Sequence, residues 1–137
     1  MEQLQKAFTL IELLIVIAII GILASVILAS LNDARDQGIN AKIKTEMDSI
    51  AKRAAIDESS SFTFDTVCGS NGFATSSEIS DLIVSINTLA SSTVTCNSDT
   101  TEYAVSVPID SYHWCVDSIG VKKELASSLA SGEYSCP

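Results

Sequence analysis

The stretch that decides the fold is KAFTLIELLIVIAIIGILASVILASL, residues 6–31. Its last nineteen residues, 13–31, carry no charge. At 1.5 Å per residue, a helix of this length covers about 28 Å, close to the roughly 30 Å hydrocarbon core of a bilayer. Because backbone polar groups in lipid must be satisfied within the segment, the stretch predicts a membrane-spanning helix. A removable secretory signal has a shorter apolar part, about 7–15 residues, followed by a small-residue cleavage site that is not evident here.

A single acid, Glu12, stands at the start of this helix. An isolated carboxylate in lipid costs several kcal/mol and by default marks a functional site. Lys6 is the only fixed positive charge near it in the sequence. A cut between Ala7 and Phe8 supplies another, because the new α-ammonium group of Phe8 lies four residues before Glu12 on the same helix face. A plain single-span anchor explains the length of the helix but not Glu12.

The segment FTLIELLIVIAIIGILASVIL, which starts at Phe8, resembles the N-terminus of type IV pilins and pseudopilins. The resemblance implies that a prepilin peptidase removes a leader, residues 1–7, by cutting after Ala7. It implies N-methylation of the new N-terminal residue, Phe8. It also implies that Glu12 pairs with the N-terminal ammonium group of a neighbouring copy during fibre assembly, so that a second subunit neutralises the carboxylate.

Two residues depart from the pattern of that family. Ala7 replaces the usual glycine before the cut, so slower processing is expected. Ala29 stands where many type IV pilins carry a proline, and no proline occurs before Pro108, so no proline kink is expected in the helix.

Lys6, just before the span, favours a cytoplasmic N-terminus. The chain is then expected to cross the inner membrane once with its head outside, and later to lie in an extracellular pilus.

The expected organisation continues the spanning half of the helix, residues 8–31, into an amphipathic half, residues 32–58. Apolar residues recur there at steps of three or four: Ile39, Ile43, Met47, Ile50 and Ala54. They form one stripe. The charges on the opposite face, Lys42, Lys44, Asp48 and Lys52, fit a solvated face. The alternative is that Asp33, Arg35, Asp36 and Lys42 make salt bridges between subunits, and the sequence does not separate the two.

The remaining residues, 59–137, predict a small globular head that begins at Ser59-Ser60-Ser61. A short helix is expected over residues 77–90, where Thr75 and Glu78 have the spacing of a capping box. Alternating apolar residues predict strands over 103–107, 112–117 and 121–125, with Pro108 ending the first. The fold class is therefore α+β and pilin-like, with a long helix packed on a three-stranded antiparallel sheet.

All four cysteines, Cys68, Cys96, Cys115 and Cys136, lie after the span. An even number of cysteines in a small exported head predicts two disulfides, for which three connectivities are possible. We favour Cys68–Cys96, which staples the loop carrying the short helix. Cys115–Cys136 then ties the tail to the sheet, similar to the C-terminal disulfide loop of many pilins. A zinc site fits poorly, because the spacings include no C-x-x-C and match no common zinc module.

No constellation in the sequence indicates catalysis, a cofactor or a metal. The only histidine, His113, lies beside Trp114 in an expected strand, and no G-x-S-x-G or phosphate-binding loop occurs. Asn97, Asp99 and Glu102 offer three oxygen donors in one loop, too few alone for the six to eight that Ca²⁺ prefers. The net charge of −9 argues against binding to nucleic-acid phosphates.

The function expected from these residues is that of a structural subunit of a type IV pilus or pilus-like filament. The resemblance implies further copies of the chain, the prepilin peptidase and the assembly platform of the inner membrane as partners. One alternative is a major pseudopilin of a type II secretion or DNA-uptake system, which has the same architecture. A second is a membrane-tethered adhesin or binding module, which leaves Glu12 unexplained.

Overall fold

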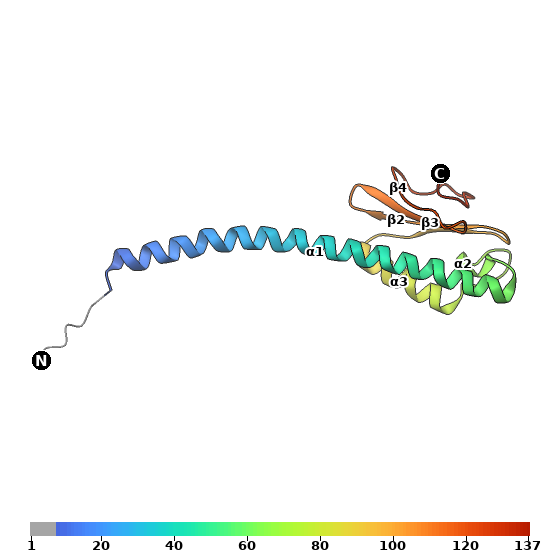
Figure 1. Cartoon of the computed structure of the whole chain (residues 1–137), viewed down its shortest axis with the longest axis horizontal. Coiled ribbons are helices and arrows are strands. Elements are labelled where there is room, and N and C mark those ends of the chain that lie inside the picture. Colours follow the sequence, from blue (N-terminus) through green and yellow to red (C-terminus); the bar gives the residue numbers. More distant parts are fainter. Residues whose placement is uncertain (1–7) are drawn as a thin grey trace, which may run out of the picture. The chain divides into compact units, whose positions relative to one another are not determined.

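The computed structural model describes residues 8–137, and the expected leader with Ala7 lies outside these residues. The chain divides into two units, one ending at Gln37 and the other comprising Gly38–Pro137. Figure 1 shows the elements in chain order. They are α1 (Leu10–Ser61), α2 (Asp65–Cys68), α3 (Ser77–Ala90), β1 (Thr95–Ser98), β2 (Tyr103–Ile109), β3 (Tyr112–Asp117) and β4 (Lys122–Leu125). The α+β class and the long N-terminal helix are confirmed.

Helix α1 ends three residues later than expected from the sequence, at Ser61 rather than at residue 58. The three serines taken as the exit are helical, and their hydroxyl groups donate to carbonyls of the preceding turn. Ser59 Oγ donates to Ile56 O at 2.7 Å, and Ser61 Oγ donates to Asp57 O at 2.7 Å. Such back-bonding satisfies the hydroxyls locally, so a serine run does not by itself end a helix.

The sheet has four strands, not three, in the order β1-β2-β3-β4 with every neighbouring pair antiparallel. Strand β1 falls in the segment that was expected to be a loop. Strand β2 also passes through Pro108 to Ile109. Because β1 begins at Thr95, opposite Ser106, β2 has only β3 as a neighbour at Pro108, and a missing N–H is tolerated on the open side.

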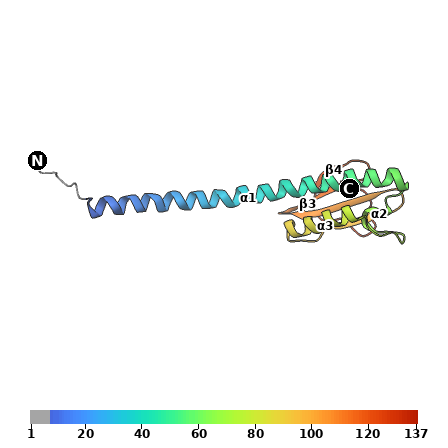
Figure 2. The same cartoon turned by 90° about the horizontal axis from the view of Figure 1, so that it is seen from below.

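The main core lies between the C-terminal part of α1, helix α3 and one face of the sheet. The predicted stripe is confirmed: Ile43, Met47, Ile50 and Ala54 are buried, and Ile39 packs against them. They meet apolar residues of α3 and of the sheet: Ile79, Ile86, Tyr103, Val105, Val107 and Val116. Figure 2 shows α3 beside this part of α1. Arg53 of α1 also pairs with Glu78 of α3 at 3.4 Å.

The opposite face of the sheet is covered by the C-terminal segment, which the sequence analysis did not assign to any layer. Ala104, Cys115, Leu129 and Cys136 form a second buried cluster there. Figure 1 shows this segment on the side of the sheet turned away from α1. Both faces of β2 are therefore shielded from solvent. This explains why Ala104 and Ser106, whose side chains alternate with those in the main core, are also fully buried.

Two charged residues that were interpreted as part of a solvated face lie against the sheet instead. Lys44 Nζ lies 4.2 Å from the centre of the Trp114 ring and 3.7 Å from Glu124 Oε1. Asp48 Oδ1 forms an ion pair with Lys122 Nζ at 2.9 Å. The helical period places both residues beside the buried stripe, where long side chains reach the edge of the sheet.

The capping box expected for α3 is wrong. Ser76, not Thr75, precedes the helix, and its side chain makes no capping hydrogen bond. Glu78 instead accepts a hydrogen bond from Ser77 Oγ at 2.9 Å and faces Arg53. The start of α3 instead contacts two other segments, because Ser76 N–H donates to Thr66 O at 2.9 Å and Glu78 pairs with Arg53 of α1.

Candidate functional site

The first turn of α1 holds Glu12 in a reciprocal capping arrangement with Thr9. The Thr9 backbone N–H and hydroxyl both donate to Glu12 Oε2, at 2.9 and 2.8 Å. The Glu12 N–H donates back to Thr9 Oγ1 at 3.3 Å. This is a capping box, in which residues three apart satisfy each other's orphan donors at a helix start. The sequence analysis missed it, although the T-x-x-E spacing before an apolar run is its signature.

The capping box leaves one oxygen of the carboxylate available. Within residues 8–137, Glu12 Oε1 accepts no hydrogen bond and Glu12 takes part in no ion pair. Its neighbours are exposed apolar side chains, including Phe8, Leu10 and Ile11. A carboxylate that keeps its charge in such surroundings requires a cation. One oxygen of the Glu12 carboxylate therefore remains able to bind a cation beside the start of the helix.

The helix that follows Glu12 is long and apolar enough to cross a membrane. Its side chains over residues 13–31 are exposed, as expected for a segment that meets lipid or other helices rather than its own head. Ser25, a polar residue within this segment, donates its hydroxyl proton to Ile22 O at 2.7 Å. It therefore places no unsatisfied polar group in the apolar region.

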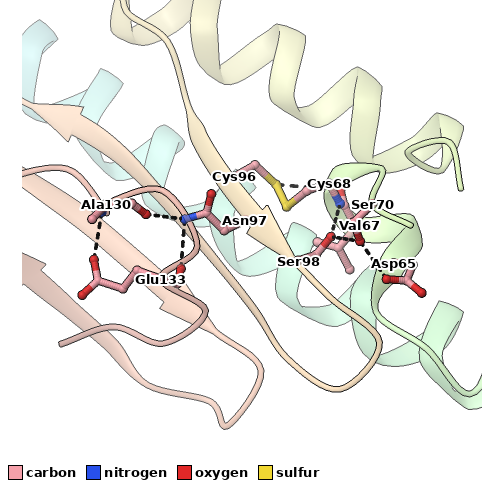
Figure 3. Close-up of a disulfide and its surroundings, with 9 residues drawn as sticks. All are labelled: Asp65, Val67, Cys68, Ser70, Cys96, Asn97, Ser98, Ala130 and Glu133. Carbon is pink, nitrogen blue, oxygen red and sulfur yellow. Dashed lines mark hydrogen bonds between the residues drawn. A yellow bond between two sulfur atoms is a disulfide. The ribbon is translucent and has the colours of Figure 1, made fainter. Parts of the chain in front are cut away.

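The head carries two disulfides, and the structure describes no free cysteine. Cys68 at the end of α2 is bonded to Cys96 in β1, and Cys115 in β3 is bonded to Cys136 in the tail. This is the pairing favoured from the sequence. Figure 3 shows the first disulfide between two sets of hydrogen bonds that hold β1.

Residues 3–28 match the family model described as the prokaryotic N-terminal methylation motif. The chain carries the class III leader of type IV pilins and pseudopilins. No curated protein and no solved structure matches the chain. The motif marks a substrate of the prepilin peptidase that is assembled into filaments, and it belongs to structural pilins and pseudopilins rather than to an enzyme family. The apolar helix fits a membrane-anchored pilin.

The structure places only some of the predicted site residues of this pilin-like chain. Phe8 is the first described residue and is 83 % exposed, whereas Ala7, on the other side of the expected cut, lies outside the described residues. Glu12 lies one turn after Phe8, within the same apolar segment. The two expected determinants of assembly, the new N-terminus and the acid, therefore occupy one end of α1.

Two of the three residues considered for Ca²⁺, Asn97 and Asp99, have side chains that make hydrogen bonds within the head. Asn97 Nδ2 donates to Ala130 O and Glu133 O at 2.8 and 2.9 Å, and so anchors the tail. Asp99 Oδ1 accepts from the backbone N–H groups of Thr101 and Glu102. In the described part of the chain, no group of three or more metal-binding side chains occurs.

A buried carboxylate beside the first disulfide was also missed. Asp65 is only 3 % exposed and accepts hydrogen bonds from neutral donors in three segments. They come from Thr63, Ser70, Asn71 and Thr100. Ser98 Oγ links this network to the disulfide, because it accepts from Cys68 N at 3.2 Å and contacts Ser70 Oγ at 3.2 Å. The network joins the end of α1, the α2 loop and the β1–β2 turn.

This network predicts that the head loses stability in acid. The hydrogen bond from Ser70, supported by those from the other donors, lowers the pKa of Asp65, against the effect of burial, which raises it. A carboxyl group with a lowered folded-state pKa contributes its full stability above the unfolded-state value, about 3.9 for Asp. That contribution is lost as the pH falls through the folded-state pKa. Thermal unfolding of the head, followed across the acid range by the near-ultraviolet dichroism of Trp114, measures this effect.

The matched control is Asp65→Asn, which is expected to unfold at a lower temperature near neutral pH but to show a shallower decline in acid. A variant with the same acid dependence as the wild type would show that other carboxyl groups are responsible.

Proposed function

We propose that the chain is the structural subunit of a type IV pilus or pilus-like filament. The leader, residues 1–7, is removed after Ala7, and Phe8 becomes the methylated N-terminus. The subunit resides in the inner membrane with its N-terminus in the cytoplasm and its head outside. It is then drawn by the assembly platform into a homopolymeric filament whose core is the packed apolar helices.

The observation that carries this proposal is the state of Glu12. Its Oε2 atom is occupied by the capping box with Thr9, and its Oε1 atom accepts no bond from the described residues. In the filament, the methylated ammonium group of a neighbouring subunit supplies the positive charge that balances Glu12. Lipid offers no such charge. The capping box orients the carboxylate before that partner arrives, because the hydrogen bonds from Thr9 restrict its rotamers.

The major pseudopilin of a secretion or DNA-uptake system is the second candidate. The observation that favours it is the absence of a helix proline before Pro108, since many type IV pilins carry one. The two disulfides and the serine- and threonine-rich head favour an exposed, durable pilus instead. In both cases the chain is cut, methylated and polymerised in the same way.

The first experiment is the intact mass of protein sheared from the cell surface, measured before and after reduction. We expect a mass that begins at Phe8 and includes one methyl group. Reduction of the two disulfides is expected to add four hydrogens. Full-length protein found only in the membrane fraction would instead favour a membrane-tethered binding module.

A further inference from the structure

The loop between α2 and α3 contains the sequence Asn71-Gly72, the only asparagine in the chain that is followed by glycine. Both residues are exposed and have positive φ angles, 49° and 86°. Apart from Gly72 itself and its two chain neighbours, no described residue has an atom within 4 Å of the position that a Cβ of Gly72 would occupy. In the described part of the chain, the Gly72 N–H donates no hydrogen bond, whereas the next residue, Phe73, donates to Ser70 O. The Gly72 nitrogen is thus both unhindered and unengaged.

The side chain of Asn71 has a defined task in this loop. Its Nδ2 atom donates to Asp65 Oδ1 at 2.8 Å, beside the hydrogen bond that Ser70 Oγ gives to the same oxygen at 2.7 Å. Within residues 8–137, Asp65 has no cationic partner. The buried charge of Asp65 therefore depends on neutral donors, and each lost donor leaves it less compensated.

We propose that Asn71 is a self-modification site, at which the chain deamidates and thereby places a second carboxylate beside the buried Asp65. In the first step the Gly72 backbone nitrogen gives up its proton and attacks Cγ of Asn71. A new C–N bond closes a five-membered imide, the bond from Cγ to Nδ2 breaks, and the side-chain nitrogen leaves with the proton as ammonia. Water then opens the ring at either carbonyl and yields aspartate or isoaspartate. The reaction requires only water and a base.

Glycine at the second position permits this attack because no side chain blocks the nitrogen. Asp65 opposes it, because the hydrogen bond from Asn71 fixes the amide in the folded loop. The reaction is therefore expected to be slow in the intact head and faster once the loop is released. Reduction of the Cys68–Cys96 disulfide, which closes this loop, is expected to release it.

The product is expected to weaken the head. The conversion removes a donor to Asp65 and replaces it with a like charge at hydrogen-bond distance, which disfavours both ionised forms. Loss of one hydrogen bond to a buried charged acceptor raises the unfolded fraction by about tenfold, even though Thr63, Ser70 and Thr100 still donate to Asp65. The effect should fade in acid, where one of the two carboxyl groups is protonated.

The experiment uses the full chain in detergent micelles, incubated at mildly alkaline pH and followed by peptide mass spectrometry. We expect a gain corresponding to replacement of NH₂ by OH, confined to the peptide with Asn71, together with isoaspartate at that position. Asn97 is the internal control, because its amide is also hydrogen-bonded but is followed by serine. Asn71→Gln keeps an amide donor and is expected to abolish the gain, since ring closure to a six-membered imide is slow.

The structural consequence is tested separately with Asn71→Asp, which mimics the product. We expect its unfolded fraction to be about tenfold above that of the wild type near neutral pH, with the difference shrinking in acid. An unchanged mass at Asn71 after prolonged incubation, an equal gain at Asn97, or an Asn71→Asp variant as stable as the wild type would each overturn the proposal. None of these outcomes depends on whether the chain forms pili.

Discussion

Replacement of Glu12 by glutamine is expected to abolish filaments at the cell surface while leaving the subunit in the membrane. The proposed partner of Glu12 is the ammonium group of a neighbouring Phe8, and glutamine removes the charge that attracts it. Glutamine retains the carbonyl oxygen that accepts from Thr9, and a capping box functions with either residue. The substitution therefore removes the negative charge of residue 12 and keeps the helix cap. Sheared filament yield and the membrane content of the subunit are the two measurements.

The matched control is Thr9→Val, which removes the hydroxyl contacts to Glu12 and keeps the charge. Losing an N-terminal cap costs a helix about 1 kcal/mol, which a helix of 52 residues tolerates. We expect this variant to assemble, although with lower yield because the carboxylate is less restricted. Glu12→Ala, which removes both functions, is expected to resemble Glu12→Gln.

The opposite pattern would contradict the proposed pairing. If Glu12→Gln formed normal filaments and Thr9→Val did not, the feature required for assembly at this end of α1 would be the helix cap rather than the charge. If neither variant entered the membrane fraction, Glu12 would act in insertion, and its proposed role in polymerisation would be lost.

The features that could be predicted from the sequence are those that depend on local periodicity. The apolar run and the stripe through Ile43 and Met47 fix the two halves of α1, because a helix repeats its faces every three or four residues. The sequence also predicted α3 with the observed bounds, Ser77–Ala90. Alternation of apolar residues predicted β3, Tyr112–Asp117, because a strand buried on one face has a period of two.

The features that were missed depend on contacts between distant segments. Strand β1 is the polar tetrapeptide TCNS, which has no strand pattern of its own. It is held by pairing with β2, by the disulfide at Cys96 and by the hydrogen bonds of Asn97 to the tail. The tail itself covers the sheet through only two buried residues, Leu129 and Cys136. Sequence pattern carries little information about such a layer.

The candidate site at the start of α1 was predictable in its residues but not in its geometry. Glu12 is conspicuous because it is an acid in an apolar run, and its charge alone indicates a partner. Its contact with Thr9 was not predicted, although the spacing T-x-x-E before an apolar run is that of a capping box. Three donors to Asp65 lie within six residues of it and Thr100 lies 35 residues away, but nothing in the sequence indicates that this carboxylate is buried.

Removal of the Cys68–Cys96 disulfide is expected to have the largest effect on the stability of the head. The bond closes a loop with a sequence separation of 28 residues, which in the chain-entropy model is worth about 3.6 kcal/mol. The loop contains all of α3. Without the disulfide, α3 is less constrained to stay near α1, and the core between the two helices is expected to weaken. We expect the paired variant Cys68→Ser with Cys96→Ser to show a strongly reduced denaturant midpoint and rapid proteolysis between α2 and β1.

The paired variant Cys115→Ser with Cys136→Ser is the matched comparison. Its loop has a sequence separation of 21 residues, worth about 3.3 kcal/mol in the same model, but it encloses no helix. The tail keeps other anchors, because Asn97 holds Ala130 and Glu133 and Asp117 Oδ2 accepts from Cys136 N at 2.9 Å. We therefore expect the tail to become protease-sensitive while the α1–α3 core stays folded.

Either loss is a large part of the 5–15 kcal/mol that stabilises a typical domain, so reduction of both bonds is expected to unfold the head. Denaturant unfolding of the detergent-solubilised chain, followed by the near-ultraviolet signal of Trp114, compares the two variants with the wild type. Trp114 reports on the main core, because it packs against the buried cluster and under Lys44. Equal midpoints for the two variants would show that loop closure alone sets the stabilisation. A smaller effect for Cys68–Cys96 would mean that the Asp65 network and the β1–β2 ladder hold this loop without the covalent bond.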